Sequence, residues 1–347
     1  MDKQFITSFL PAELEEQIIS LGQPKFRAKQ IFDWLHVKKV NSFEDMTNLP
    51  KSLISLLNEK YCFTKLTIEK KLVSKIDGTI KYLYKLNDQN YVESVCMEYK
   101  YGISLCLSTQ VGCKMGCRFC ASTKAGFVRN LDASEILQQV YSTAADIGKR
   151  ISSIVLMGIG EPLDNYDNVI KFLMLVSEPL GNNLSLRHVS LSTCGLVDKI
   201  EELAKLKLGV TLSISLHAPN DDIRNKTMPI NNKWNIDVLL KACKKYVIIT
   251  SRRISFEYAL ISGVNDSKEC ADELASRLHG MLCHVNLIPV NEIKEVSYIK
   301  STRKRAMEFC DMLNKNGINT TIRRTLGEDI NAACGQLRRD NVKREEE

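Results

Sequence analysis

Three cysteines within eight residues are the first feature with clear chemical capacity. Cys113, Cys117 and Cys120 occur in VGCKMGCRFCAS, residues 111–122, with CxxxCxxC spacing and no fourth cysteine nearby. A structural zinc site normally takes four protein ligands, whereas three thiolates can bind three irons of a [4Fe–4S] cluster and leave the fourth iron open to a small molecule. The compact spacing favours the cluster. Zinc completed by a distant histidine is the alternative.

The chain after residue 103 contains the strands and helices needed to position this triplet. The expected strands are ISLCLST, SSIVLMG, HVSLST, GVTLSIS, RISFEYALI, CHVNLIP and NTTIRR, and amphipathic helical stretches lie between them. This alternation predicts right-handed βαβ units around a parallel sheet, as a complete or partial barrel or as a doubly wound sheet. Both arrangements bind ligands at the carboxyl ends of the strands. The cysteine triplet follows the first strand directly.

Two smaller segments precede this α/β region. Residues 1–62 predict a helical accessory module, because apolar residues recur every three or four positions in PAELEEQIISL, FRAKQIFDWLH and PKSLISLLNEKY. Residues 63–102 predict a β-ribbon linker, in which Asp77-Gly78 forms a hairpin turn and YVESVCMEY alternates as a strand. At the other end of the chain, residues 338–347 form a charged tail.

Composition and charge limit the classes of protein to consider. The 347 residues are 44% hydrophobic and carry a net charge of +7. The N-terminus lacks the basic and apolar regions of a secretory leader, and no stretch stays apolar for the roughly 20 residues that a membrane helix needs. We therefore expect a cytoplasmic protein without membrane contact. Twelve cysteines dispersed through a chain of this length indicate reduced thiols rather than a disulfide framework.

Residues 24–39 combine positive charge with aromatic side chains. The segment PKFRAKQIFDWLHVKK contains five lysines and arginines against one acid, with two phenylalanines and a tryptophan interleaved. Phosphate contacts and base stacking are the interactions that RNA binding uses. Composition alone favours the simpler interpretation, an amphipathic helix with a solvated basic face and a buried aromatic face. RNA binding is the alternative.

Further motifs identify a resemblance to a known family. CxxxCxxC after the first barrel strand is the signature of radical S-adenosylmethionine (SAM) enzymes, and MGIGEPLDN, LSTCG, SISLHAP and AACGQL resemble the RlmN/Cfr family of RNA adenine methyltransferases. The resemblance extends from the N-terminus to about residue 337. It implies a partial (β/α) barrel of the radical SAM type over residues 103–337, ending in a loop with a catalytic cysteine. It also implies a [4Fe–4S] cluster on the cysteine triplet, with SAM on the open iron. With the family in view, residues 1–62 are expected to be an accessory RNA-binding module that uses the segment 24–39, and STRKR at residues 301–305 and Arg323-Arg324 are expected to add to the RNA-binding groove.

The same resemblance implies the residues that contact SAM. Each of them follows a predicted strand, as expected for ligand-binding residues of this architecture. In GIGEP, Gly158 and Gly160 are expected to let the backbone approach the ligand, and the carboxylate of Glu161 can accept hydrogen bonds from the SAM ammonium. The implied contacts are Gly160, Glu161, Ser192, Ser215, Leu216, His217 and Asn291.

Three residues outside these loops are implied in catalysis. The resemblance makes Cys334, in AACGQL, the carrier of a methyl group taken from one SAM, and a second SAM in each turnover generates the radical that couples this carbon to the RNA base. Glu93, in YVESV, is the implied acceptor of the ring proton. Cys106, on the first core strand, then attacks the sulfur of Cys334, which releases the RNA and leaves a transient disulfide. Taken singly, both thiols would be core residues and Glu93 a solvated strand residue.

The substrate and the reacting carbon follow from the branch of the family. The C2 branch methylates an adenine of 23S rRNA and, in some members, the adenine 3′ of the anticodon in tRNA, and its electrons come from a donor such as flavodoxin or ferredoxin. Pro162 after Glu161 resembles the C2 branch more than the Cfr branch, which methylates carbon 8 and remains the alternative. A non-catalytic iron–sulfur protein that binds RNA or acts as a sensor is an alternative of another class.

Overall fold

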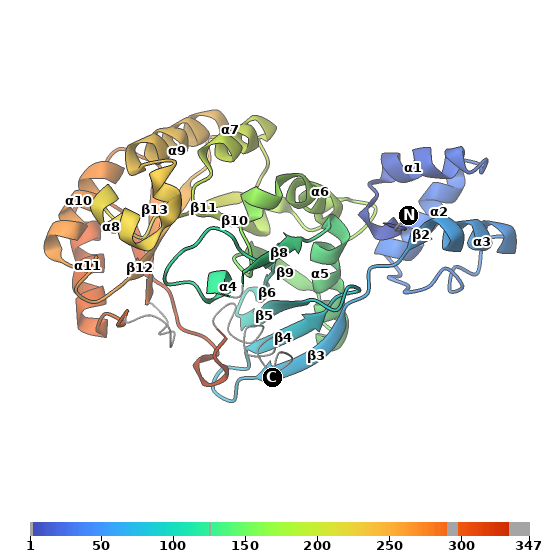
Figure 1. Cartoon of the computed structure of the whole chain (residues 1–347), viewed down its shortest axis with the longest axis horizontal. Coiled ribbons are helices and arrows are strands. Elements are labelled where there is room, and N and C mark those ends of the chain that lie inside the picture. The colour runs from blue at the N-terminus through green and yellow to red at the C-terminus, as the bar shows by residue number, and fades with distance from the viewer. Residues whose placement is uncertain (1–2, 125, 290–297, 333–347) are drawn as a thin grey trace.

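A ten-stranded sheet forms the centre of the protein (Figure 1). The computed structural model describes residues 3–124, 126–289 and 298–332. The strand order is β14-β13-β12-β11-β10-β9-β6-β5-β4-β3. The strands are β3 (Thr67–Val73), β4 (Ile80–Lys85), β5 (Tyr91–Tyr99), β6 (Gly102–Cys106), β9 (Ile151–Leu156), β10 (Val189–Thr193), β11 (Thr211–Ser215), β12 (Ile254–Leu260), β13 (Cys283–Pro289) and β14 (Thr320–Ile322).

The seven strands from β6 to β14 form the parallel part of this sheet. They follow one another in chain order, which excludes a doubly wound sheet because that topology reverses its order at a switch point. β14 and β3 are edge strands among the described residues, so the sheet stays open. The prediction of an α/β partial barrel is confirmed. The helices between the strands lie on its outer side (Figure 1). They are α5 (Ala133–Ile147), α6 (Tyr166–Ser177), α7 (Val197–Leu206), α9 (Ile236–Thr250), α10 (Lys268–Leu278) and α11 (Arg303–Lys315). The short helix α8 (Asp221–Thr227) lies instead at the carboxyl ends of β10 and β11.

The ribbon of β3, β4 and β5 continues the same sheet with antiparallel pairing. The hairpin turn lies where Asp77-Gly78 predicts it, closed by the bond from the Ser74 amide to the Thr79 carbonyl. Side chains alternate along these strands. Tyr82 on β4 faces α5, where its hydroxyl donates to Asp146, whereas the odd-numbered positions face the opposite side of the sheet. This alternation decides which ribbon residues can reach a site at the barrel opening.

The N-terminal helices form a module at one end of the molecule (Figure 1). They pack around buried apolar side chains such as Leu14, Ile31 and Leu53. The module contacts the barrel where the imidazole of His36 lies 3.0 Å from the hydroxyl of Tyr141 on α5. Its elements are β1 (Gln4–Phe5), η1 (Ile6–Ser8), α1 (Pro11–Ser20), α2 (Phe26–His36), α3 (Lys51–Lys60) and β2 (Tyr61–Cys62).

Within the described ranges, no helix combines the length and the apolar character needed to cross a lipid bilayer.

Short elements complete the described chain. The short elements are β7 (Gln110–Gly112), α4 (Ala121–Lys124), β8 (Phe127–Asn130), η2 (Pro162–Asn165), η3 (Leu186–His188), η4 (Pro229–Asn232) and η5 (Glu328–Ile330).

We expect the N-terminal helices to lose stability as the pH falls below about 6.5. Burial lowers the pKa of His36 to about 3, so between these two values the unfolded chain binds one more proton than the folded chain. The free energy of unfolding therefore decreases as the pH falls, by about 2 kcal/mol from this residue at about pH 5. Urea unfolding followed by Trp34 fluorescence, at neutral pH and at about pH 5, measures the change.

Two variants make this test specific. His36→Asn keeps a polar group near the Tyr141 hydroxyl but does not titrate in this range, so it should reduce the pH dependence. His279 is exposed on the surface, and His279→Asn should preserve the wild-type dependence. The same pH dependence in His36→Asn and wild type would contradict the assignment.

Candidate active site

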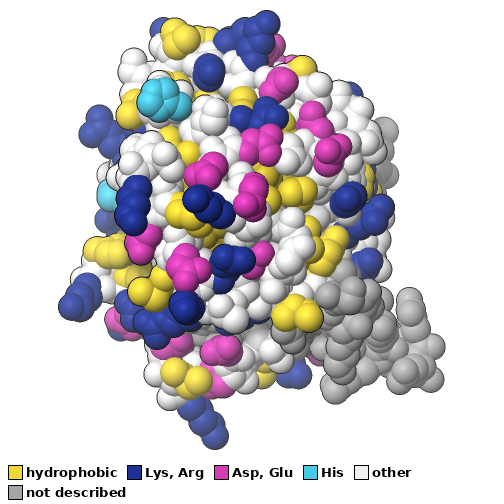
Figure 2. Space-filling view, turned by 90° about the vertical axis from the view of Figure 1, so that its left-hand side faces the viewer, with side chains coloured by type: hydrophobic (Ala, Val, Ile, Leu, Met, Phe, Trp, Pro, Cys, Tyr) yellow, Lys and Arg dark blue, Asp and Glu magenta, His cyan; other side chains and the backbone are white. Residues whose placement is uncertain are grey.

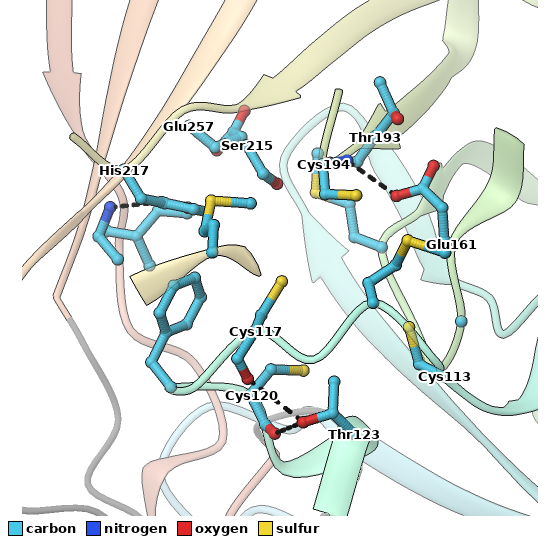
Figure 3. A pocket seen from close by; sticks show the side chains of 18 of the residues that line it. Cys113, Cys117, Cys120, Thr123, Glu161, Thr193, Cys194, Ser215, His217 and Glu257 are labelled. Carbon is cyan, nitrogen blue, oxygen red and sulfur yellow. Dashed lines mark hydrogen bonds between the residues drawn. The ribbon is translucent and has the colours of Figure 1, made fainter. Parts of the chain in front are cut away.

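A cavity of about 270 Å³ lies at the carboxyl ends of the parallel strands (Figure 3). Its wall is built by loops from every part of the barrel, as the strand alternation predicts. The residues that line it and carry polar or sulfur groups are Cys113, Met115, Cys117, Cys120, Thr123, Met157, Glu161, Ser192, Thr193, Cys194, Ser215, His217, Met228, Glu257 and Arg323.

The three cysteines of CxxxCxxC lie at one end of this cavity (Figure 3). Cys113 and Cys117 are buried and Cys120 is half-buried. The amide of Cys120 donates to the Cys117 carbonyl. The Thr123 hydroxyl lies within hydrogen-bond distance of the carbonyl oxygens of Cys117 and Cys120. Burial raises the pKa of Cys113 to about 12, so thiolates here need a cation. A metal group bound by these cysteines would favour their thiolate forms.

This arrangement fits an iron–sulfur cluster better than a single zinc ion. Among the described residues, no three His, Cys, Asp or Glu side chains converge closely enough to hold one metal ion. Ligands of a cluster bind different irons and stand farther apart than ligands of one ion. Three cysteines around one cavity, with open space beside them, suit a cluster whose fourth iron takes a small molecule.

The GIGEP loop after β9 is held tightly against the loop after β6. A Cβ on Gly158 would lie 2.4 Å from the Leu107 carbonyl oxygen, and one on Gly160 would lie 2.6 Å from Cβ of Gln110. The two glycines are required by packing against the protein. Both glycines also line the first cavity, so the expectation that their backbone approaches a ligand stays a prediction. Gly160 also has φ +108°, which L side chains rarely adopt.

Glu161 is a buried carboxylate on the wall of the cavity. One oxygen accepts from the amide of Cys194 at 2.8 Å and the other from the amide of Leu163 at 3.1 Å. Burial raises its pKa, and these hydrogen bonds act in the opposite direction. Each carboxylate oxygen retains acceptor capacity. Glu161 can therefore accept further hydrogen bonds from a cation in the cavity.

His217 is held as a neutral imidazole at the end of β11. Its Nδ1 accepts from the amide of Ala259 at 2.8 Å, so the ring proton lies on Nε2. Burial lowers the pKa of His217 to about 3, and the charge of Arg224 adds to this. The backbone has φ 56°, and its carbonyl accepts from the Asn265 amide group at 2.8 Å. The left-handed backbone at this site is thus fixed by buried hydrogen bonds.

The other predicted SAM contacts divide into three cases. Ser192 and Ser215 line the cavity. The side chain of Leu216 instead belongs to the hydrophobic core, and its amide donates to the Glu257 carbonyl at 3.1 Å. Asn291 lies outside the described residues.

A second cavity of about 250 Å³ adjoins the first, and the two share wall residues such as Met157, Gly158 and Arg323. It is lined by Glu93 from the ribbon and by Cys106 from β6. Burial raises the pKa of Cys106 to about 11, while the charge of Arg323 acts in the opposite direction. The structure thus brings together two of the three predicted catalytic residues. Cys334 lies outside the described residues.

Glu93 is buried and bears a charged partner. Its side chain is 2% exposed, and its Oε2 lies 3.1 Å from Nζ of Lys81, which is 1% exposed. Lys81 also donates to the carbonyl of Asn331 at 3.0 Å. The interpretation of Glu93, taken singly, as a solvated strand residue is wrong, because odd-numbered positions of β5 face this cavity and even-numbered ones face α5.

Comparisons with known proteins agree with this geometry. A profile described as "Radical SAM superfamily" matches residues 107–275, and one described as "Ribosomal RNA large subunit methyltransferase N-terminal domain" matches residues 6–63. Two relatives named "Probable dual-specificity RNA methyltransferase RlmN" are 54% and 53% identical. The Clostridium novyi protein covers 97% of this chain and 98% of its own, and the Alkaliphilus oremlandii protein covers 99% of each. The chain belongs to the RlmN family of radical SAM RNA methyltransferases.

A solved structure shows that the likeness extends over almost the whole fold. A radical SAM methyltransferase from Sphaerobacter thermophilus is 41% identical, covers 96% of this chain and 98% of its own, and superposes with a TM-score of 0.91. The protein is thus a SAM-dependent RNA methyltransferase, with SAM and an iron–sulfur cluster as cofactors. The similar proteins bear the name RlmN, so the comparisons favour this branch over Cfr. They also favour an enzyme over a non-catalytic iron–sulfur protein.

Sequence reasoning missed three buried charged residues of this RlmN-family site, of which Lys81 is the partner of Glu93 described above. Arg224 on α8 is fully buried and donates to the carbonyls of Cys194 and Ser215, which joins the ends of β10 and β11. Glu257 on β12 lines the first cavity, and its carboxylate accepts from Asn286 at 2.8 Å. A lone acid inside the apolar strand ISFEYAL is a signal that could have identified Glu257. Arg224 lies in a polar segment and gives no such signal.

We expect Gly160→Ala to weaken SAM binding and to lower the free energy of unfolding by about 2 kcal/mol. The new methyl group would clash with Gln110, whose side chain accepts from the amide of Glu161 at 2.8 Å. Equilibrium binding of SAM to the anaerobically reconstituted protein and chemical denaturation measure the two effects.

Gly209→Ala is the matched control, because its Cβ would meet no atom closer than 3.5 Å. That variant should bind SAM like the wild type. Wild-type SAM affinity in Gly160→Ala would show that the close packing of this loop has no part in the binding site.

Proposed function

We propose that this RlmN-family enzyme methylates carbon 2 of an adenine in 23S rRNA and in tRNA, with Cys334 as the carrier of the methyl group. The observation that carries the proposal is the second cavity, where Glu93 and Cys106 share one wall beside the cofactor cavity. Ala332 also lines this cavity, and Cys334 follows it by two residues in the sequence. A carboxylate that can accept the ring proton and a thiol therefore line one cavity next to the proposed SAM site, and Ala332 lines it with them.

The substrate explains why a carrier is needed. Carbon 2 of adenine lies between two ring nitrogens and is too electron-poor to attack the methyl sulfonium of SAM. A cysteine thiolate is a good nucleophile and can accept the methyl group by ordinary displacement. One SAM is consumed in this step and a second in the radical step. When bound, the cluster supplies the electron for radical chemistry, and the protein supplies position.

The first cavity suits the binding of both cofactors. Cys113, Cys117 and Cys120 would hold the [4Fe–4S] cluster. Glu161 would accept hydrogen bonds from the SAM ammonium. Gly160, Ser192, Ser215 and His217 would complete the contacts, and the side chain of Leu216 would support the loop from the core. Asn291 remains a prediction.

Glu93 is suited to accept the ring proton after the carbon has been added to the base. Water is largely excluded from its carboxylate, and the ammonium of Lys81 lies 3.1 Å from Oε2 and holds the carboxylate in place. The same ammonium donates to Asn331, three residues before Cys334. Lys81 would thus fix the proton acceptor in relation to the segment that carries the methyl group.

Cys106 is suited to release the product. Attack of its thiolate on the sulfur of Cys334 forms an S–S bond and breaks the bond from that sulfur to the transferred carbon. The electron pair stays with this carbon, which takes up a proton to become the methyl group. A donor such as flavodoxin or ferredoxin would supply electrons to the enzyme. The positive charge of Arg323 at the same cavity favours the thiolate of Cys106.

The N-terminal helices would bind the RNA outside the cavities. Phe26 is 53% exposed, with the guanidinium of Arg27 over its ring at 4.9 Å, and Nζ of Lys38 lies 3.5 Å from the ring centroid of Trp34. Phe32, in contrast, is buried. On this proposal residues 1–62 are the accessory RNA-binding module, 63–102 the ribbon and 103–337 the catalytic barrel. Because rRNA and tRNA are its substrates, the enzyme would act in the cytoplasm.

Mass spectrometry of nucleosides tests the substrate and the carbon together. Deletion of the gene should remove 2-methyladenosine from 23S rRNA and tRNA, and expression of the wild-type gene should restore it. Loss of 8-methyladenosine instead would establish the Cfr-type reaction. Loss from rRNA alone would contradict the tRNA part of the proposal.

Cys106→Ala should retain RNA covalently bound through Cys334, because no thiol can then break the bond between sulfur and carbon. The adduct is detected as a nuclease-sensitive band of lower mobility on denaturing gels of the purified protein. Cys96→Ala is the matched control, because Cys96 is a buried thiol on β5 whose even-numbered position faces away from the cavity. Cys106→Ala protein free of RNA would contradict the resolving role.

A further inference from the structure

Two tyrosines stack on each other where β5 turns into β6. The rings of Tyr99 and Tyr101 lie 5.0 Å apart between centroids, with an interplanar angle of 6°. Tyr99 lines the cavity that contains Glu93 and Cys106. Tyr101 is 74% exposed, so this pair extends from the cavity wall to the surface.

Two arginines lie on the same cavity. Arg323 and Arg324 follow β14 directly, both are exposed, and both line the cavity with Tyr99. Neither forms an ion pair with another residue in the described part of the chain. Elsewhere positive side chains often have acidic partners, as Arg277 has in Asp237 and Glu273. The face shown in Figure 2 likewise has positive and negative side chains interspersed.

We propose that this rim, defined as Tyr99, Tyr101, Arg323 and Arg324, binds a nucleotide next to the target adenine in single-stranded RNA. The base of that nucleotide stacks on the outer face of Tyr101, and the arginines bind adjacent phosphates. The inference rests on the proposed function and deepens it by naming residues that present the RNA to the cavity.

The energetics of base entry support this assignment. An adenine that enters a cavity of about 250 Å³ leaves the stack of its own strand, at a cost of a few kcal/mol. Its neighbour loses a stacking partner at the same time. Tyr101 replaces that partner, because two parallel aromatic rings already form a stack that a third ring can extend. Such stacking is tolerant of sequence, which suits an enzyme that acts on two kinds of RNA.

The charges at the rim fit the same ligand. Unpaired guanidinium groups bind phosphate through several donors, and single-stranded RNA presents phosphates beside its bases. An acidic peptide would match the arginines but would not use the aromatic face. Exposed aromatic side chains and cationic side chains that form no ion pair within residues 3–124, 126–289 and 298–332 lie together at the opening of a base-sized cavity, and this combination indicates RNA.

Kinetics with an RNA stem-loop that contains the target adenine tests the rim. Tyr101→Leu keeps apolar bulk but loses the aromatic face, so the KM for RNA should rise about 10-fold with a kcat within about twofold of wild type. Tyr101→Phe keeps the ring and should retain the wild-type KM. Because Tyr101 is exposed, neither variant should disturb the fold, and circular dichroism checks this.

The salt dependence of RNA binding tests the arginines separately. Arg324→Gln should reduce the slope of log affinity against log salt by about one phosphate contact. Lys245→Gln removes an equal charge from α9, where Lys245 pairs with Glu201, and should keep the wild-type slope. A wild-type slope in Arg324→Gln would remove the arginine from the rim.

The outcomes separate this proposal from the function on which it rests. Wild-type protein that methylates RNA, with Tyr101→Leu of equal KM, would overturn the rim and leave the function intact. Wild-type protein that cleaves SAM but methylates no RNA would overturn the proposed function and the rim with it. A raised KM in Tyr101→Leu, together with the wild-type KM in Tyr101→Phe, supports stacking as the interaction.

Discussion

The pairing of β6 on both its edges is the constraint on which the site depends. β6 pairs antiparallel with β5, where Cys106 lies opposite Val95, and parallel with β9, where Cys106 lies opposite Val155. A slip of one residue along β5 would turn Glu93 to the other face of the sheet. The loop after β9 is fixed in the same way, because Gly158 packs on the Leu107 backbone just beyond β6. The pairing of β6 thus determines which residues of the neighbouring strands and loops face the two cavities.

The buried charged side chains of the site serve the reaction more than they serve the stability of the fold. Arg224 uses its guanidinium to bind backbone carbonyls and the side chain of Asn231, and the pair of Lys81 and Glu93 is removed from water. Apolar residues of equal volume would often stabilise such positions as well or better. These buried charged side chains lie where the ends of the strands meet the cavities. Their hydrogen-bond partners hold the loops that a reacting ligand must find already in place.

The sequence predicted the elements well because apolar periodicity is a local signal, and all seven core strands appear where their runs predicted them. It could not choose between barrel and doubly wound sheet, since periodicity carries no information on which strands are neighbours. The cysteine triplet and the resemblance predicted a part of the residues that line the two cavities. Leu216 is a predicted SAM contact whose side chain lies in the core instead, because adjacent residues at the end of a strand point in opposite directions. The burial of Glu93 depends on which face of β5 it occupies, and this is set by the pairing of β5 with β4 and β6. The role of Arg224 becomes visible only once the positions of the loops that it joins are known.

The sequence does not show which aromatic residues form the RNA-binding surface, because their exposure and their neighbours depend on the fold. The segment 24–39 combines aromatic and basic residues, yet α2 turns Phe32 inward while Phe26 is exposed. Tyr101 sits in a short turn with few basic neighbours in sequence. The return of the chain after β14 brings Arg323 and Arg324 to the cavity that is also lined by Tyr99, on which Tyr101 stacks. A stacking surface with phosphate-binding groups is a property of distant segments. On the proposed function, the N-terminal helices would bind the body of the RNA. The rim would act on the nucleotide beside the reacting base, so the two surfaces would control affinity and presentation separately.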